Sequence, residues 1–268
     1  MTTNNQTQAT FNSPLANHPR IAIVLTAVGF AGLCALELIP AGKILPPLLL
    51  FFSLGMVALC LMPFVLGLPN GRKAFQEYCR DIRLLPAQPL ARNILLGLLL
   101  ALLTLASIFL ASLLTGHFAI DWSTIPALRW VKGLTRGIWE EVFFRGIILA
   151  LFMRLYPRRR AVLLSAFLFA MMHLSVPSLE VAVDLISLFF MGLLFVYVVL
   201  KTGSLLPAII FHYVHDVFVN WVQNTPGADN VLSSALLYGF LWVALIVGAL
   251  LTKLIVERWS GGSHWAVG

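Results

Sequence analysis

Along most of the chain, hydrophobic residues run in long stretches that only short polar segments interrupt. An α-helix needs about 20 mainly apolar residues to cross the roughly 30 Å hydrocarbon core of a bilayer. Windows of this kind predict about eight membrane-spanning helices, at residues 21–39, 44–68, 93–115, 137–156, 160–175, 181–200, 204–222 and 231–256. Pro157 and the arginines after it separate the fourth window from the fifth, because proline breaks a helix. The predicted fold is all-α, a polytopic membrane helical bundle.

The polar segments divide the chain into one membrane domain and two tails. Residues 1–19 are polar and lack the pattern of a signal peptide, so we predict a disordered tail. Residues 20–258 form a single predicted transmembrane domain, and residues 259–268 a short C-terminal tail. Residues 117–136 mix tryptophans and basic residues with apolar ones, which suits an interfacial helix or a re-entrant turn. A plain connecting loop is the alternative for this segment.

The composition also indicates an integral membrane protein, since 60% of the 268 residues are hydrophobic and only 11% are charged. The basic residues fall mainly on one side of the predicted bundle, which by the positive-inside rule places both termini in the cytoplasm. That side carries Arg20, Arg72, Lys73, Arg80, Arg83, Arg92, Arg154, Arg158, Arg159, Arg160, Lys201, Lys253 and Arg258, and the other side Lys43, Arg129, Lys132 and Arg136. The net charge of +7 is explained by loops beside anionic lipid head groups, so no nucleic-acid partner is predicted.

Charged residues inside the fourth predicted span point to a functional site. A charged side chain at the centre of a bilayer costs roughly 2.5 to 3.5 kcal/mol on insertion scales, and it usually faces a bundle interior or a watery cavity. Glu141 and Arg145 are four residues apart on one helix face, so we predict an ion pair between them. Glu140 points about 100° away on the helix and has no evident partner within its own helix. Its carboxylate is therefore available for a catalytic role or for a partner on another helix.

Histidines and a further carboxylate occupy two later spans. His173 follows Phe169 by one helical turn, and Asp216 follows His212 by one turn, with His215 between them. An aspartate at this spacing can orient an imidazole, and a free glutamate that faces two histidines can act as a general base on water. The same side chains are also acceptable ligands for a divalent metal such as zinc, although the H-E-x-x-H helix is absent. Both interpretations stay open at this point.

Each of these residues also has a structural interpretation when it is taken alone. The pair of Glu141 and Arg145 could serve stability only, and a single histidine on an apolar helix is more often a hydrogen-bonded packing residue. Glu180 and Asp184 lie near span ends, where water reaches them. The joint presence of Glu140, His173 and His212 on three separate spans is what favours a functional site.

Three ordered motifs resemble those of a known family. They are Glu-Glu-x-x-x-Arg at 140–145, Phe-x-x-x-His at 169–173 and His-x-x-x-Asp at 212–216. This combination is similar to the CPBP family, which contains the CAAX prenyl endopeptidases and their bacterial bacteriocin-processing, Abi-like relatives. The resemblance covers about residues 129–222, the motif core, whereas the first three predicted spans and the last match only as hydrophobic helices.

The resemblance implies an intramembrane endopeptidase with a defined set of site residues. Glu140 would activate the attacking water, His173 and His212 would bind it or stabilise the oxyanion, and Asp216 would complete the set. Glu141, Arg145 and Phe169 would support them. The family has been described both as metal-dependent and as glutamate-dependent, so Glu140, His173, His212 and Asp216 are also the candidate ligands of a metal such as zinc. No cofactor is predicted with certainty.

The implied substrate is a peptide bond of a membrane-associated or lipidated protein or peptide, in contact with membrane lipids. The implied location is a bacterial inner membrane. Two other classes of function compete with the peptidase. A non-catalytic membrane scaffold or immunity factor would use the same fold to bind a partner, and a proton-coupled transporter would use the carboxylates and histidines as a relay. The transporter is less well supported, because the chain shows no repeat between its halves.

Overall fold

The computed structural model describes residues 24, 72–85, 88–116, 118–120, 127–173, 179–219, 222–224 and 231–259. The predicted tail at 1–19 and the predicted spans at 21–39 and 44–68 lie outside these residues, apart from Val24. The predicted C-terminal tail lies outside them from residue 260 onward. The described fold therefore begins at residue 72 and ends at residue 259, with Val24 as a single described residue before it.

Helices dominate the described residues and account for each of the six later predicted spans. The elements in chain order are α3 (Arg72–Asp81), α4 (Leu90–Thr115), β1 (Phe118–Ile120), α5 (Ala127–Glu141), the π-helical segment η2 (Val142–Ile148), α6 (Leu149–Leu155), α7 (Arg158–Met171), α8 (Leu179–Thr202), α9 (Leu206–Phe218), β2 (Val222–Asn224) and α10 (Val231–Trp259). The helical architecture agrees with the prediction, whereas the strands were not predicted.

Among the described residues, three helices are long and apolar enough to cross a bilayer. They span Leu90–Thr115, Ala182–Thr202 and Ala235–Trp259, and Leu206–Phe218 is a shorter apolar helix. The chain is thus an all-helical membrane protein in its main architecture, and the count of about eight spans stays a prediction.

The predicted fourth span is longer and less regular than expected. It starts at Ala127 in α5 and continues without a break through η2 and α6 to Leu155. Pro157 then ends it, as predicted, and stands at the start of α7. All seven residues of η2 are buried. A π-helical turn inside an α-helix is uncommon and frequently marks a functional site.

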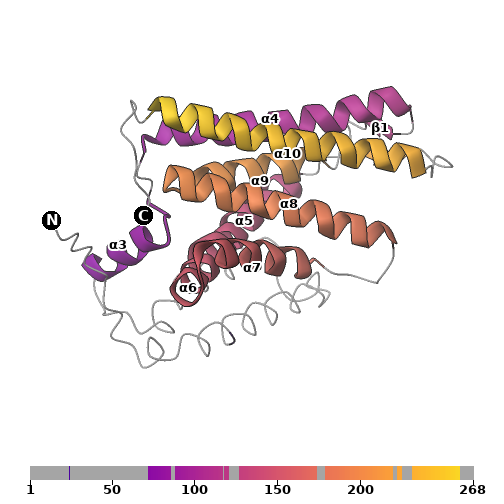
Figure 1. Ribbon diagram of the computed structural model, residues 1–268. Helices are drawn as coiled ribbons and strands as arrows, with labels where there is room; N and C mark the ends of the chain where they lie inside the picture. The colour runs from indigo at the N-terminus through magenta and orange to yellow at the C-terminus, as the bar shows by residue number, and fades with distance from the viewer. Residues whose placement is uncertain are drawn as a thin grey trace, which may run out of the picture.

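The helices form a layered bundle (Figure 1). α4 and α10 lie side by side along one face, α8 and α9 lie beneath them, and α5, α6 and α7 lie on the other side of α8 and α9. α4 is capped at its C-terminal end by Gly116, whose φ of 64° is the left-handed conformation that glycine adopts without strain. A buried cluster of mainly aromatic side chains lies between the end of α5, η2, α6 and α7, and its largest members are Trp139, Phe143, Phe144, Phe152 and Phe169.

Residues 117–136, predicted as an interfacial helix or a re-entrant turn, contain β1 of a short antiparallel ribbon and, from Ala127, the first part of α5. β1 pairs with β2, and Phe118 lies opposite Asn224 in the register. Because three-residue strands carry only a weak sequence signal, hydropathy alone does not reveal them. The ribbon ties the chain just before α5 to the chain just after α9, and it thereby helps to hold these two helices next to each other.

The contact between α4 and α9 depends on Gly97. A Cβ atom at this position would lie 2.6 Å from the carbonyl oxygen of Pro207 and 2.8 Å from Cβ of Ile210. We therefore expect Gly97→Ala to lower the free energy of unfolding by about 1 to 3 kcal/mol through overpacking. Unfolding of the purified protein in detergent micelles measures this.

Gly239→Ala is the matched control for this substitution. A Cβ atom on Gly239 of α10 would have no described atom within 4 Å. The gain in helix propensity, at most about 1 kcal/mol, should leave this variant as stable as the parent protein or more stable. Equal stability of the two alanine variants would contradict the close approach of α4 and α9.

Candidate active site

Glu140 and Glu141 end α5 on the side that packs against α9. Gly137, one turn earlier, makes this packing close: a Cβ atom there would lie 3.2 Å from the carbonyl oxygen of Ile209 and 3.2 Å from the backbone nitrogen of Tyr213. His212 lies between these two α9 residues in the sequence. Because Gly137 has no side chain, α5 can approach α9 closely enough to bring the carboxylates of Glu140 and Glu141 to the imidazole of His212. Hydropathy does not predict this close approach.

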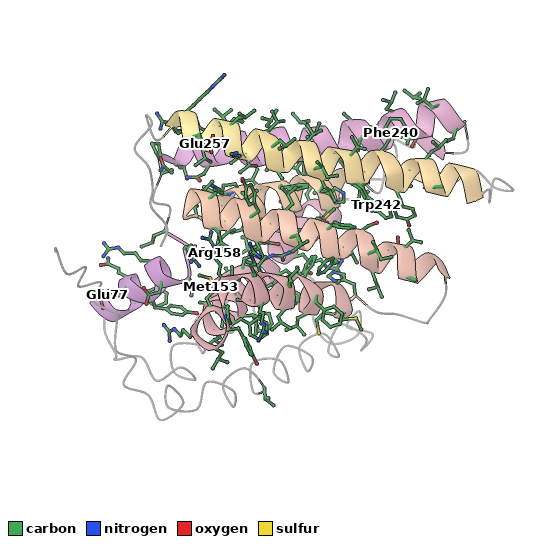
Figure 2. All side chains as sticks on the ribbon, viewed as in Figure 1. Glu77, Met153, Arg158, Phe240, Trp242 and Glu257 are labelled. Atoms are coloured by element: carbon green, nitrogen blue, oxygen red, sulfur yellow. The ribbon has the colours of Figure 1, made fainter. Side chains whose placement is uncertain are left out.

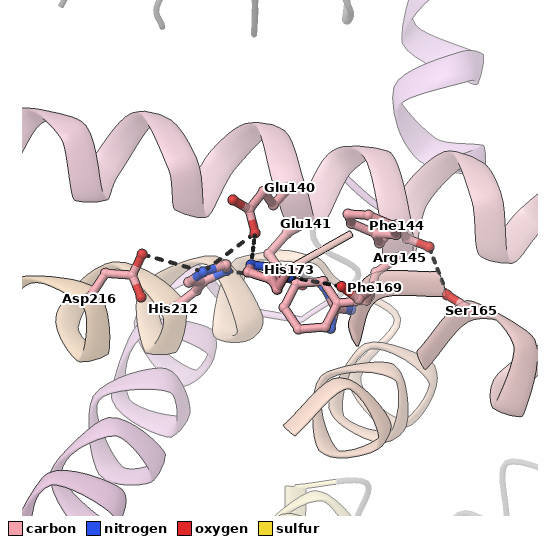
Figure 3. Close-up of polar contacts among 9 residues, drawn as sticks. All are labelled: Glu140, Glu141, Phe144, Arg145, Ser165, Phe169, His173, His212 and Asp216. Carbon is pink, nitrogen blue, oxygen red and sulfur yellow. Dashed lines mark hydrogen bonds and ion pairs between the residues drawn. The ribbon is translucent and has the colours of Figure 1, made fainter. Parts of the chain in front are cut away.

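Glu141 is bonded to two side chains through a single oxygen atom. Its Oε1 accepts a hydrogen bond from Nη1 of Arg145 at 3.0 Å and lies 2.9 Å from Nδ1 of His212 (Figure 3). The ion pair with Arg145 that the spacing predicted is confirmed. The bond to His212 was not predicted, because residues 71 positions apart in the sequence share no local pattern. Since a carboxylate accepts, Nδ1 of His212 donates, and Nε2 is turned toward Glu140.

Arg145 is fully buried, and aromatic rings surround its guanidinium. Its Cζ atom lies 4.0 Å from the ring centroid of Phe169 and 4.8 Å from that of Phe195. Among the described residues, its Nε and Nη2 atoms have no hydrogen-bond partner, so the ring faces provide much of their stabilisation. Phe169 of the second motif therefore supports the buried cation. Phe195 on α8 has the same role and was missed, because nothing distinguishes it from other apolar residues of that helix.

The π-helical segment is anchored to α7 behind this ion pair. The N–H of Leu149 reaches the carbonyl oxygen of Phe144, which also accepts a hydrogen bond from Oγ of Ser165 at 3.0 Å. Ser165 is fully buried, so its hydroxyl satisfies a backbone group that the apolar surroundings would otherwise leave weakly paired. This contact fixes η2, and with it Arg145, relative to α7, which ends two residues before His173.

Glu140 lies at the meeting point of three helices. Its Oε2 is 3.8 Å from Nε2 of His173 and 3.8 Å from Nε2 of His212. His173 donates from Nδ1 to the carbonyl oxygen of Phe169 at 2.8 Å, so its Nε2 is also the atom turned toward the carboxylate. Within the described part of the chain, Oε2 of Glu140 has no hydrogen-bond partner although it is buried. The structure thus brings together the carboxylate and the two imidazoles that the motifs singled out.

Asp216 is a second carboxylate next to Nε2 of His212. Its Oδ2 lies 3.5 Å from Nε2 of His212, and its Oδ1 lies 3.8 Å from Nδ1 of His215. The side chains of His173 and Asp216 are 36% and 27% exposed, whereas those of Glu140 and His212 are 7% exposed. The cluster is therefore buried at Glu140 and His212 and partly exposed along His173 and Asp216.

The donor atoms are of the types that zinc prefers, since both histidines present Nε2 to the carboxylate. Glu141 on Nδ1 of His212 is also the kind of outer partner that orients a metal-binding histidine. As they stand, however, no three histidine, cysteine or acidic side chains of the described residues are arranged to hold a metal ion. The observed arrangement of the described side chains thus does not itself form a metal centre.

These features define a helical membrane protein with a polar site buried between its helices. Residues 122–218, which contain all three motifs, match the family model described as Rce1-like, type II CAAX prenyl endopeptidase Rce1-like. The resemblance to the CPBP proteases is thereby confirmed for this segment. α3, α4 and α10 lie outside the match. No curated protein and no solved structure matches the chain.

Proposed function

We propose that the protein is an intramembrane endopeptidase in which Glu140 activates the water that attacks a peptide bond. The observation that carries this proposal is the position of the Glu140 carboxylate, 3.8 Å from Nε2 of both His173 and His212. A gap of this length between polar atoms is suited to a bridging water rather than to direct hydrogen bonds. The family match supports a protease that acts on a peptide or protein.

The reaction follows from this arrangement. Glu140 takes a proton from the bound water, and the resulting hydroxide attacks the carbonyl carbon of the substrate. The carbonyl oxygen becomes an oxyanion, which accepts hydrogen bonds from Nε2–H of a protonated His173 or His212. The carbon–nitrogen bond then breaks, and the amine leaves with the proton that Glu140 had taken.

The remaining side chains position these groups. Asp216 and Glu141 hold the His212 ring from its two nitrogen atoms, at 3.5 Å and 2.9 Å. Arg145 donates a hydrogen bond to Glu141, and the ring of Phe169 lies against the Arg145 guanidinium. These two contacts keep the Glu141 carboxylate in place. If a divalent metal such as zinc is required, Glu140, His173, His212 and Asp216 are the residues that we propose to rearrange around it.

The substrate that we propose is a membrane-associated or lipidated peptide, which reaches the cluster from the side of His173 and Asp216. This route would bring the substrate in from a bilayer that α4, α8 and α10 are long and apolar enough to cross. The proposed location is a bacterial inner membrane, with both termini in the cytoplasm, as the distribution of basic residues predicts.

Cleavage of a panel of membrane-anchored and prenylated peptides by the purified protein tests the function. We expect cleavage of at least one class of peptide at a defined bond, detected by mass spectrometry. We further expect that a metal chelator leaves the rate unchanged. Loss of activity with the chelator, restored by zinc, would replace the glutamate mechanism with a metal site. Absence of cleavage by folded protein across the panel would favour the scaffold or immunity factor.

A further inference from the structure

His215 is the third histidine of the described residues, and it takes no part in the reaction proposed above. It lies on α9 between His212 and Asp216, directly before the aspartate. Its side chain is mostly buried, with 12% exposed. A buried polar ring beside a carboxylate of the candidate active site calls for a physical explanation.

Packing holds the ring of His215 in place. Its centroid lies 6.0 Å from that of Phe211, one turn earlier on α9, and the two ring planes are nearly perpendicular at 79°. Phe211 is fully buried in the main hydrophobic core. Side chains fill the space between the helix layers (Figure 2), so the imidazole has little room to turn away from Asp216.

The two ring nitrogens of His215 have different surroundings. Nδ1 lies 3.8 Å from Oδ1 of Asp216, whereas Nε2 is buried and has no hydrogen-bond partner among the described residues. In a neutral imidazole one nitrogen carries the proton and the other accepts. Because a buried N–H group without a partner is rarer in proteins than an unpaired acceptor, we place the proton on Nδ1. The N–H of His215 is therefore directed at the carboxylate.

Asp216 lies between two imidazole rings, with one of its oxygens toward each. Oδ1 faces His215, and Oδ2 lies 3.5 Å from Nε2 of His212 (Figure 3). The terminal torsion of an aspartate is only weakly restricted, and this side chain is 27% exposed, so water competes for its oxygens. A donor on Oδ1 opposes rotation of the carboxylate and keeps Oδ2 next to His212.

The orientation of Asp216 matters because of the atom that Oδ2 faces. Nε2 of His212 is also the nitrogen turned toward Glu140, at 3.8 Å, and in the proposed reaction it donates to the oxyanion. Asp216 and Glu141 hold this imidazole from its two nitrogens, so a loose Asp216 lets the ring turn. A displacement of about 1 Å in a catalytic group can lower the rate by about 100-fold.

We propose that His215 is a positioning residue of the peptidase reaction, whose Nδ1–H holds the Asp216 carboxylate against Nε2 of His212. This inference rests on the proposed function. The distance of 3.8 Å between Nδ1 and Oδ1 is longer than a hydrogen bond. Catalytic hydrogen bonds are often long before substrate binds and shorten in the complex, and a small turn of Asp216 shortens this one.

Steady-state cleavage of the best peptide of the panel by the purified full-length protein tests the proposal. Leucine and asparagine have nearly the same shape, and both remove the ring, but only asparagine places an N–H donor near the position of Nδ1. We expect His215→Leu to lower kcat by about 10- to 100-fold and to leave KM within about two-fold, since His215 acts through Asp216 and not on the substrate. His215→Asn should recover most of the lost kcat.

Thermal unfolding shows whether each variant is folded. If His215→Leu does not fold, His215→Ala takes its place, because alanine also lacks the donor and adds no bulk to the core. An equal loss of kcat in the folded leucine and asparagine variants would assign the effect to packing of the ring and overturn the proposal. A loss that appears in KM alone would also overturn it.

A double variant connects the effect to Asp216. Asp216→Ala removes the carboxylate that His215 holds, so the addition of His215→Leu should lower the single-turnover rate by less than about two-fold. A further loss as large as in the parent protein would show that His215 acts elsewhere. A parental rate in folded His215→Leu would contradict this role and leave the proposed peptidase intact, whereas absence of cleavage by the parent protein would remove both.

Discussion

Glu140→Gln is expected to lower the cleavage rate by about 10²- to 10⁴-fold, because an amide cannot take the proton from the attacking water. Glutamine has nearly the shape of glutamate, so Nε2 of His173 and His212 keep their neighbour at 3.8 Å. The buried carboxylate oxygen makes no hydrogen bond with the described residues, so the fold loses little with it. Single-turnover cleavage of the best peptide of the panel measures the rate, and thermal unfolding measures the stability.

Glu257→Gln is the matched control for this variant. It makes the same chemical change at an exposed position of α10, outside the family match, and should cleave at the parental rate. A Glu140→Gln protein that is folded and still cleaves within a few-fold of the parental rate would remove Glu140 from the mechanism. If Glu140→Gln and Glu257→Gln protect or recruit a partner protein equally well, the result supports a scaffold function and argues against the peptidase function.

Arg145→Met is expected to have the largest effect on stability, a loss of about 3 to 5 kcal/mol in the free energy of unfolding. Arg145 and Glu141 are both fully buried and 3.0 Å apart. Removal of the cation leaves the Glu141 carboxylate in an apolar interior with His212 as its single described hydrogen-bond partner. The substitution also takes away the charge that stacks on Phe169. Chemical unfolding in detergent micelles measures the loss.

The double variant Glu141→Gln, Arg145→Met separates the ion pair from packing. It removes both charges, and we expect it to recover a substantial part of the stability that Arg145→Met loses, because no uncompensated charge is left buried. It should stay poorly active, since glutamine holds His212 less firmly than a carboxylate does. Arg160→Met, at an exposed position of α7, should change stability by less than about 0.5 kcal/mol. A single variant Arg145→Met as stable as the parent protein would show that the buried pair is not important for the fold.

The fold could be predicted in outline because membrane insertion depends on local composition. A run of about 20 apolar residues must bury its backbone polar groups in a helix, and this requirement needs no tertiary information. For this reason a helix lies in each predicted span from 93–115 onward, although three of the described helices are long and apolar enough to cross a bilayer. Pro157 acts locally as well, and it separates α6 from α7 as predicted. The β1–β2 ribbon and the π-helical segment depend on contacts between distant residues, and neither was predicted.

The sequence by itself pointed to the residues of the candidate site and predicted the pair of Glu141 with Arg145, because charges in an apolar helix and four-residue spacing are local features. Only the tertiary structure decided how these residues work together. Gly137 lets α5 approach α9, and Glu141 reaches His212 across 71 positions of the chain. The physical reason is that helix packing depends on the shapes of two surfaces, and a single sequence does not reveal which surfaces will meet.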